Sequence, residues 1–221
     1  YQQGDVEGLG EGWRNPVRAV TIQPFAMGTH EVTFHEYDKF AIATNRRLPE
    51  DQGWGRGQRP VINVTWEDAT AYAAWLAEAT GESYRLPTES EWEYAARSGE
   101  KQQVWAGPSE ESQLGDYAVY ASNSGNRTAE VGSKAANGLG LKDLSGNVWE
   151  WMEDCWHEHY QGAPSDGSGW GDAGGGDCGL RVVRGGSWGN NPGFLRSSLR
   201  GRDTTDNRND LLGFRLAQGT R

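Results

Sequence analysis

Two short blocks near the end of the chain, RGGSW at 184–188 and GFRL at 213–216, constrain its folding most. Both contain glycine and apolar residues of the kind that a packed domain needs. The run between them, residues 189–212, is rich in Gly, Asn and Arg, with arginines at 196, 200, 202 and 208. Because arginine and asparagine are mostly exposed in folded proteins, we expect the blocks to belong to the scaffold and the run between them to form a surface.

The whole chain, residues 1–221, reads as one domain, since no Pro/Ser-rich or single-sign charged stretch offers a linker. The sequence has 32 glycines and 11 tryptophans, and only 35% of its residues are hydrophobic. A core must therefore be built from aromatic residues and short strands joined by many turns. This composition favours a loop-rich α+β fold.

The charge of the chain argues against nucleic acid as a partner. The net charge is -10 and only four residues are lysine, whereas binding to phosphates needs clustered basic residues. No apolar run is long enough to span a bilayer, so we expect no membrane insertion. Because Tyr1 is not an initiator methionine, we expect a trimmed start, and export or a cell-surface location stays open.

Three threonines, each followed three positions later by an acidic residue, predict helix starts. These pairs are Thr33 and Glu36, Thr65 and Asp68, and Thr88 and Glu91. The apolar spacing after them predicts helices over 34–44, 66–80 and 89–97. Alternating or apolar runs predict strands at 17–22 and 61–64, and shorter apolar runs follow at 104–105, 117–120, 148–151, 181–183 and 214–216.

Cys155 and Cys178 flank a glycine-rich stretch. A disulfide between them would close a flexible loop and stabilise the fold by roughly 2–4 kcal/mol. Two separate reduced thiols are the alternative.

Several blocks in a fixed order make the chain similar to a known family. They are YRLPTESEWEYAAR at 84–97, LSGNVWEW at 144–151, and the two C-terminal blocks, together with GWGRG at 53–57 and PVINV at 60–64. The chain resembles the formylglycine-generating enzyme (sulfatase-modifying factor) family over residues 15–217. This resemblance implies an irregular, loop-rich α+β domain of C-type-lectin-like fold, with a ligand-facing surface near its C-terminal segment.

The resemblance does not extend to the catalytic metal ligands. Members that oxidise cysteine to formylglycine are expected to hold copper through two cysteines just after the RGGSW-like block. The comparable positions here are Asn190 and Leu195, and neither supplies the thiolate that Cu(I) prefers. We therefore expect no catalytic residue and no copper. A metal-dependent oxidase of the formylglycine-generating type, or an accessory or regulatory module of a larger protein, remains the alternative.

Iron is not expected either. The iron-dependent sulfoxide synthases, a second enzymatic branch of the family, carry an added helical bundle with a histidine site, which this sequence lacks. The four histidines, at 30, 35, 157 and 159, show no such spacing. We interpret His157-Glu158-His159 as a solvated loop, because two imidazoles without a third ligand make a weak metal site.

The stretch 143–150 resembles the calcium loop of the family. The resemblance implies a structural Ca²⁺ bound by Asp143, the carbonyls of Gly146 and Val148, and Glu150, all of which offer hard oxygen ligands. The alternative is that Gly146 only permits a turn and that Glu150 is an ordinary surface acid.

Some family members are the variable proteins of diversity-generating retroelements, in which adenines of Asn codons are randomised. Such codons never yield Trp, Met, Gln, Lys or Glu. These five residue types number 45 in the chain, so residues 189–217 should contain about six by composition, yet they contain none. The alternative is that a loop rich in Gly, Asn and Arg lacks those residues through its own bias.

We therefore expect a non-catalytic ligand-binding protein, in which residues 184–217 form a C-terminal variable region that recognises a protein or another surface ligand. The expected ligand-binding residues are Trp188, Gly189, Asn190, Asn191, Gly193, Phe194, Leu199, Gly201, Asp203, Asn207, Asn209, Asp210 and Leu211.

Overall fold

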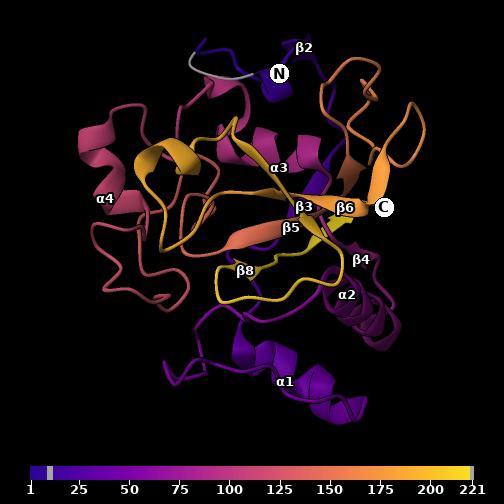
Figure 1. Cartoon of the computed structure of the whole chain (residues 1–221), viewed down its shortest axis with the longest axis vertical. Helices are drawn as coiled ribbons and strands as arrows, with labels where there is room; N and C mark the ends of the chain where they lie inside the picture. Colours follow the sequence, from indigo (N-terminus) through magenta and orange to yellow (C-terminus); the bar gives the residue numbers. More distant parts are fainter. Residues whose placement is uncertain (9–11, 220–221) are drawn as a thin grey trace.

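The computed structural model describes residues 1–8 and 12–219. Its strands form three sheets, with strand orders β1-β2, β3-β9-β4 and β7-β6-β5-β8. The strands are β1 Gln2–Gln3, β2 Arg18–Ala19, β3 Phe25–Met27, β4 Tyr84–Arg85, β5 Trp149–Trp156, β6 Asp177–Arg184, β7 Arg200–Thr204, β8 Leu212–Gly213 and β9 Ala217–Gly219. Short strands joined by long loops confirm the expected irregular α+β fold (Figure 1).

Three of the four α-helices within the described residues begin directly after the threonines that the sequence indicated. The helices are α1 Phe34–Ala43, α2 Trp66–Thr80, α3 Glu89–Ala96 and α4 Leu114–Tyr117, and short 3-10 helices are η1 Gly12–Arg14, η2 Gly99–Lys101, η3 Glu111–Gln113 and η4 Pro192–Leu195. In α1, α2 and α3 the capping threonine and the acidic residue three positions later bond to each other's backbone. Gly81 ends α2 in the left-handed conformation, with φ 76°.

The strand predictions were less accurate. Val61, Ile62 and Val64 are buried, but the stretch 61–64 is not a strand, because Asn63 adopts φ 60° and interrupts the extended backbone. Of 17–22 only Arg18–Ala19 pairs, and 104–105 contains no strand. The run 117–120 is divided between the end of α4 and an isolated bridge from Val119 to Gly146.

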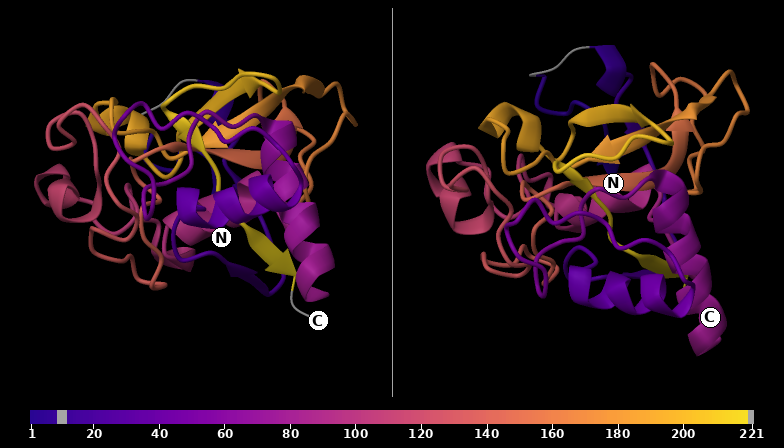
Figure 2. Two further views of the ribbon diagram at one scale, coloured as in Figure 1. Left: turned by 90° about the horizontal axis from the view of Figure 1, so that it is seen from below. Right: turned by 60° about the horizontal axis from the view of Figure 1, so that its bottom comes forward.

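The four-stranded sheet carries the C-terminal segment. β5 and β6 pair in the antiparallel direction. β7 pairs antiparallel with the other edge of β6, and β8 pairs parallel with the other edge of β5. In Figures 1 and 2, α3 lies on one side of this sheet, and α1 and α2 lie on the other. The longest strands therefore lie between two helical layers.

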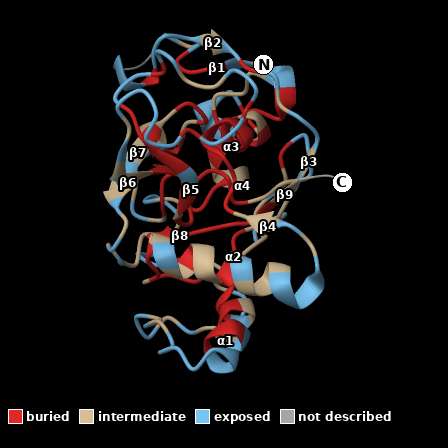
Figure 3. Ribbon diagram, turned by 90° about the vertical axis from the view of Figure 1, so that its right-hand side faces the viewer, coloured by how far each residue is buried: buried red, intermediate tan, exposed pale blue. Residues whose placement is uncertain are grey.

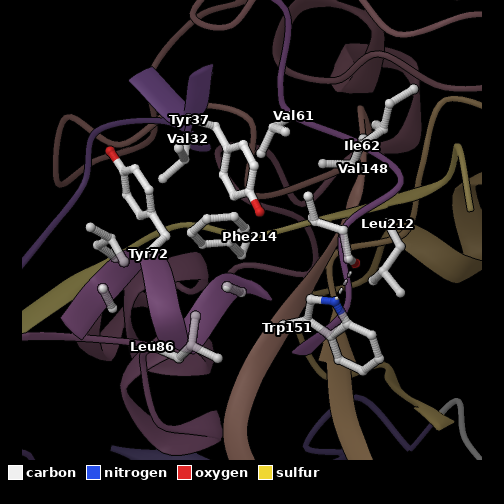
Figure 4. Close-up of a cluster of buried hydrophobic side chains, with 14 of the residues drawn as sticks. Val32, Tyr37, Val61, Ile62, Tyr72, Leu86, Val148, Trp151, Leu212 and Phe214 are labelled. Carbon is white, nitrogen blue, oxygen red and sulfur yellow. Dashed lines mark hydrogen bonds between the residues drawn. The ribbon is translucent and has the colours of Figure 1, made fainter. Parts of the chain in front are cut away.

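Two hydrophobic clusters fill these layers. One joins α1 and α2 to the sheet through residues such as Tyr37, Tyr72, Trp151 and Phe214, and the Trp151 indole donates to the carbonyl of Val64 at 3.2 Å (Figure 4). The other packs Trp92, Ala95 and Ala96 of α3 against Met152, Trp156 and Val182. Figure 3 accordingly shows α3 and β5 largely buried.

The glycine-rich stretch after β5 is fixed at both ends. Cys155 of β5 and Cys178 of β6 form a disulfide, with their Cα atoms 4.4 Å apart. Between them, the ring of His157 stacks on Trp170 with a centroid separation of 3.4 Å. His157 is buried, so its predicted place in a solvated loop was wrong, whereas His159 is exposed.

Among the helices of the described residues, none is long and apolar enough to cross a membrane.

Candidate ligand-binding site

The C-terminal segment, residues 184–217, alternates between core and surface. After β6 the chain turns at Gly185 and Gly186, which adopt φ 97° and 72°. A side chain at Gly186 would meet the carbonyl oxygen of Phe194 at 2.9 Å, so this turn requires glycine. The chain then forms η4, β7, β8 and β9 in turn.

The expectation that residues 189–212 form only a surface was wrong in part. Leu195, Ser197, Ser198 and Arg200 are buried, whereas Phe194 is 50% exposed. The buried members were missed because three of them are polar, and their burial depends on partners elsewhere in the chain.

Arg184 explains the buried serines. Its guanidinium donates to the carbonyl oxygens of Ser197 at 2.7 Å and Ser198 at 3.3 Å. It also bonds Glu89 of α3 at 3.1 Å and Glu93 at 2.5 Å. A buried arginine therefore holds the loop between η4 and β7 against α3.

Arg200 makes a second clamp on the same helix. Its Nε and Nη2 atoms donate to the two carboxylate oxygens of Glu89 at 2.7 and 3.0 Å, and its guanidinium lies over the rings of Trp156 and Tyr160. Burial alone would raise the pKa of Glu89, but the charges of Arg200 and Arg184 outweigh it, so the pKa is lowered. Glu89 is therefore held as a carboxylate in the core.

A hollow of about 430 Å³ opens beside these clamps. It is lined by Trp13 and Arg14 of η1, by Trp149 of β5, by Gly193, Phe194 and Leu199, and by Arg200 and Gly201 of β7. Four of the thirteen expected ligand-binding residues meet here: Gly193, Phe194, Leu199 and Gly201.

Trp149 connects the hollow to a second group of expected residues. Its backbone N–H donates to the carbonyl of Leu211 at 2.7 Å. Leu211 lies beside Gly189, where an added Cβ would be 3.6 Å from a Leu211 methyl carbon. The Trp188 indole donates to the carbonyl of Asp210 at 2.9 Å. Trp188, Gly189, Asp210 and Leu211 therefore lie together next to Trp149.

The polar residues among the thirteen expected ligand-binding residues mostly form hydrogen bonds within their own loops. The side-chain oxygen of Asn190 accepts from the Ser187 backbone and hydroxyl at 2.9 and 2.8 Å. Asn207 donates to Asp203 at 2.6 Å. Asn209 accepts from the backbone of Leu211 at 2.9 Å, and Asn191 is exposed before η4.

The two positions comparable to copper ligands have structural roles. Leu195 is fully buried in a cluster with Trp105, Leu114 and Ala118. Asn190 uses its side-chain oxygen to hold the RGGSW turn. These contacts offer no soft metal ligand at either position.

The proposed calcium ligands lie in a buried, charged region, and Glu150 is already occupied. Its carboxylate accepts from Nε and Nη2 of Arg215, both at 2.7 Å, and from the Trp92 indole at 2.8 Å. Asp143 accepts the backbone N–H of Gly132 at 2.6 Å. A calcium ion would have to share Glu150 with Arg215, so the ligand set inferred from the resemblance fits only in part, and calcium stays a prediction.

Sequence reasoning did not single out Glu31, which lies near these groups. It is fully buried, and neither carboxylate oxygen has a hydrogen-bond partner among the described residues. Burial raises the pKa of Glu31 well above its usual value, and the charge of Asp143 adds to the effect. Among the described residues, however, no three His, Cys, Asp or Glu side chains are grouped so that they could hold a metal ion.

Sequence reasoning also missed Trp13, Arg14, Trp149 and Arg200 as lining residues of the hollow. Trp149 stands in the NVWEW block, which marks the family but does not show which way the indole faces. No pattern around Trp13 and Arg14 signalled that η1 would lie beside residues 193–201.

A protein-family model described as the sulfatase-modifying factor enzyme 1-like domain matches residues 1–220. The chain is 29% identical to inactive C-alpha-formylglycine-generating enzyme 2 of Bos taurus, covering 99% of this chain and 85% of that protein. It is 37% identical to the formylglycine-generating enzyme of Streptomyces coelicolor, covering 74% of this chain and 54% of that protein.

Two solved structures are similar over the whole chain. PvdO from Pseudomonas aeruginosa matches with a TM-score of 0.89 and 35% identity, covering 100% of this chain and 91% of that one. Treponema denticola variable protein 1 matches with a TM-score of 0.84 and 28% identity, covering 100% and 92%. The relatives thus include an enzyme, a protein named inactive and a protein named variable.

Proposed function

The chain belongs to the family of sulfatase-modifying factor enzyme 1-like domains, and we propose that it acts there as a non-catalytic ligand-binding protein. The observation that carries this proposal is the chemistry at positions 190 and 195. An amide that holds a turn and a leucine packed in the core replace the two thiolates that copper chemistry would need. A relative named inactive supports the same reading.

The proposed binding surface consists of the hollow and the residues beside Trp149. Phe194 is 50% exposed and Trp13 is 43% exposed. Exposed aromatic side chains around a concave site supply contact area with little loss of conformational entropy on binding. Arg184 and Arg200 fix the backbone beneath, so side chains at the surface are free to serve recognition.

We further propose that this surface is diversified, as in the variable protein of a retroelement. The absence of Trp, Met, Gln, Lys and Glu from residues 189–217 supports this proposal, as does the similarity to a protein named variable. The genomic test is a reverse transcriptase gene beside a near-copy of codons 189–212 that differs only at adenines. A locus without such a repeat would remove the diversification proposal.

An oxidase is the second candidate, favoured by the 37% identity to a formylglycine-generating enzyme. The deciding experiment incubates the protein with Cu(I), oxygen and a cysteine-containing peptide, with mass spectrometry of the peptide as the readout. The Streptomyces coelicolor enzyme serves as the positive control. We expect no conversion of the cysteine, and conversion at stoichiometric copper would overturn the non-catalytic proposal.

A further inference from the structure

We propose that the hollow lined by Arg14 binds a carboxylate that is attached to an aromatic group, such as an acidic residue beside an aromatic residue on a partner protein. This inference rests on the proposed ligand-binding function and names the chemistry that the site would recognise.

Four buried donor atoms, on Arg14, Arg184, Arg196 and Ser197, have no hydrogen-bond partner among residues 1–8 and 12–219, and of these four residues Arg14 lines the hollow. They are Nη1 of Arg14, Nε of Arg184, Nε of Arg196 and the hydroxyl of Ser197. Buried polar groups are nearly always paired, and leaving one unpaired is unfavourable. Three of the four are guanidinium nitrogens, and a carboxylate is the acceptor that forms the stronger, charge-assisted hydrogen bond with a guanidinium.

The nearby glutamates already serve other arginines. Glu89 accepts from Arg184 and Arg200. Glu93 accepts from Arg184 and Arg97. These carboxylates are therefore already engaged in ion pairs away from Arg14.

Of the arginines that the structure describes, two line the hollow, and Arg200 is paired with Glu89, whereas Arg14 keeps an unpaired Nη1 and is only 7% exposed. Burial lowers the pKa of its guanidinium; the positive charges of Arg196 and Arg184 lower it further, while Asp5 and Glu7 oppose them. A ligand carboxylate would relieve this repulsion and form a charge-assisted hydrogen bond. The preference for an anion is local, since the chain as a whole carries a net charge of -10.

The other lining residues explain why the anion should carry an aromatic group. Trp13, Trp149, Phe194 and Leu199 surround the same hollow. Arg202 lies over the ring of Trp13 at 5.3 Å and brings a further positive charge next to this lining residue. A volume of about 430 Å³ suits one or two side chains or a small aromatic acid, not a bare ion.

A set of three probes with the same phenyl group tests the proposal: 4-phenylbutyrate, its primary amide and the corresponding amine. Binding is measured by ligand-detected NMR and by the fluorescence of the tryptophans in the hollow. We expect the carboxylate to bind at least about tenfold more tightly than the amide and more tightly still than the amine. Equal affinity for the three probes, or binding of none of them, would overturn the proposal.

Variants of Arg14 test whether this residue causes the preference for the carboxylate probe. In Arg14→Gln the preference for the carboxylate should vanish, in Arg14→Lys part of it should remain, and in the remote control Arg46→Gln it should be unchanged. Phe194→Ala should weaken all three probes by a similar factor. Thermal unfolding of each variant checks that it is folded, and a preference that persists in folded Arg14→Gln contradicts the proposal.

The probe experiment and the copper experiment test different claims, so the carboxylate inference and the proposed function can fail independently. If the three probes bind equally, the hollow is a ligand site without charge selectivity, and only the carboxylate inference fails. If the copper experiment shows turnover, the non-catalytic function fails whatever the probes show.

Discussion

Gly193 and Gly201 face the same hollow under different constraints. A Cβ at Gly193 would have no atom within 4 Å, whereas one at Gly201 would lie 3.0 Å from a Val183 methyl carbon and 3.3 Å from the Trp149 ring. Both are among the ligand-binding residues that the sequence predicts within the variable region. The structure separates them into an open position and a packed one.

Replacing each glycine by tyrosine should therefore give different results. Gly193→Tyr should change the free energy of unfolding by less than about 0.5 kcal/mol, as is usual for surface positions. Gly201→Tyr should cost about 1–3 kcal/mol, because the ring must displace packed neighbours. Urea unfolding measures both, and equal losses would contradict the idea that position 193 is decoupled from folding.

Residue identity alone could predict that copper ligands are missing at Asn190 and Leu195. It could not predict what those side chains do instead. The burial of Leu195 depends on Leu114 and Ala118, which are distant in sequence. Glu31 shows the same limit, because nothing around it in the sequence signals a fully buried acid.

At the scale of elements, local chemistry explains which predictions succeeded. The three long helices were predicted because a capping box lies within the first turn of each. β7 was missed because its inward position is Arg200 and not an apolar residue, so the usual alternation is absent. Its pairing with β6 and its ion pair with α3 both depend on distant parts of the chain.

Arg200 and Arg202 form a matched pair within β7, since they point to the same side of the strand and both lie over the Trp156 ring, but only Arg200 is buried. Arg200→Ala should lower the free energy of unfolding by about 3–5 kcal/mol, because it leaves the buried carboxylate of Glu89 with a missing partner. Arg202→Ala, at an exposed position, should cost less than about 1 kcal/mol. Chemical denaturation of both variants makes the comparison, and similar losses would mean that Arg200 does not clamp β7 to α3.

At the scale of the whole molecule, the hollow could not be predicted from the sequence. It is assembled from η1 near the N-terminus, the start of β5, and the C-terminal segment. The sequence identified the last of these three contributors through its unusual composition. The other two are brought there only by the tertiary fold.

Calcium binding would act on the stability of the whole fold, because the charged region around Glu31, Asp143 and Glu150 joins Arg215 to the core. At a concentration about 100 times its dissociation constant, calcium should stabilise the protein by about 2.7 kcal/mol. This corresponds to a rise in Tm of roughly 5–10 °C that EDTA reverses. Differential scanning calorimetry measures the shift.

Asp143→Asn should abolish the calcium-dependent rise, and Asp206→Asn, at an exposed position, should retain it. If calcium leaves the Tm of the unaltered protein unchanged, Glu150 serves Arg215 alone and the calcium prediction is wrong.

The disulfide between Cys155 and Cys178 has a consequence for how this protein survives proteolysis. It spans the stretch 156–177, whose tip is largely exposed, while β5 and β6 on either side are paired within the sheet. A protease that cuts this stretch would leave two polypeptides that stay covalently linked and folded together. Such a nicked molecule would run as one species on a non-reducing gel, and its two pieces would separate only after reduction and unfolding.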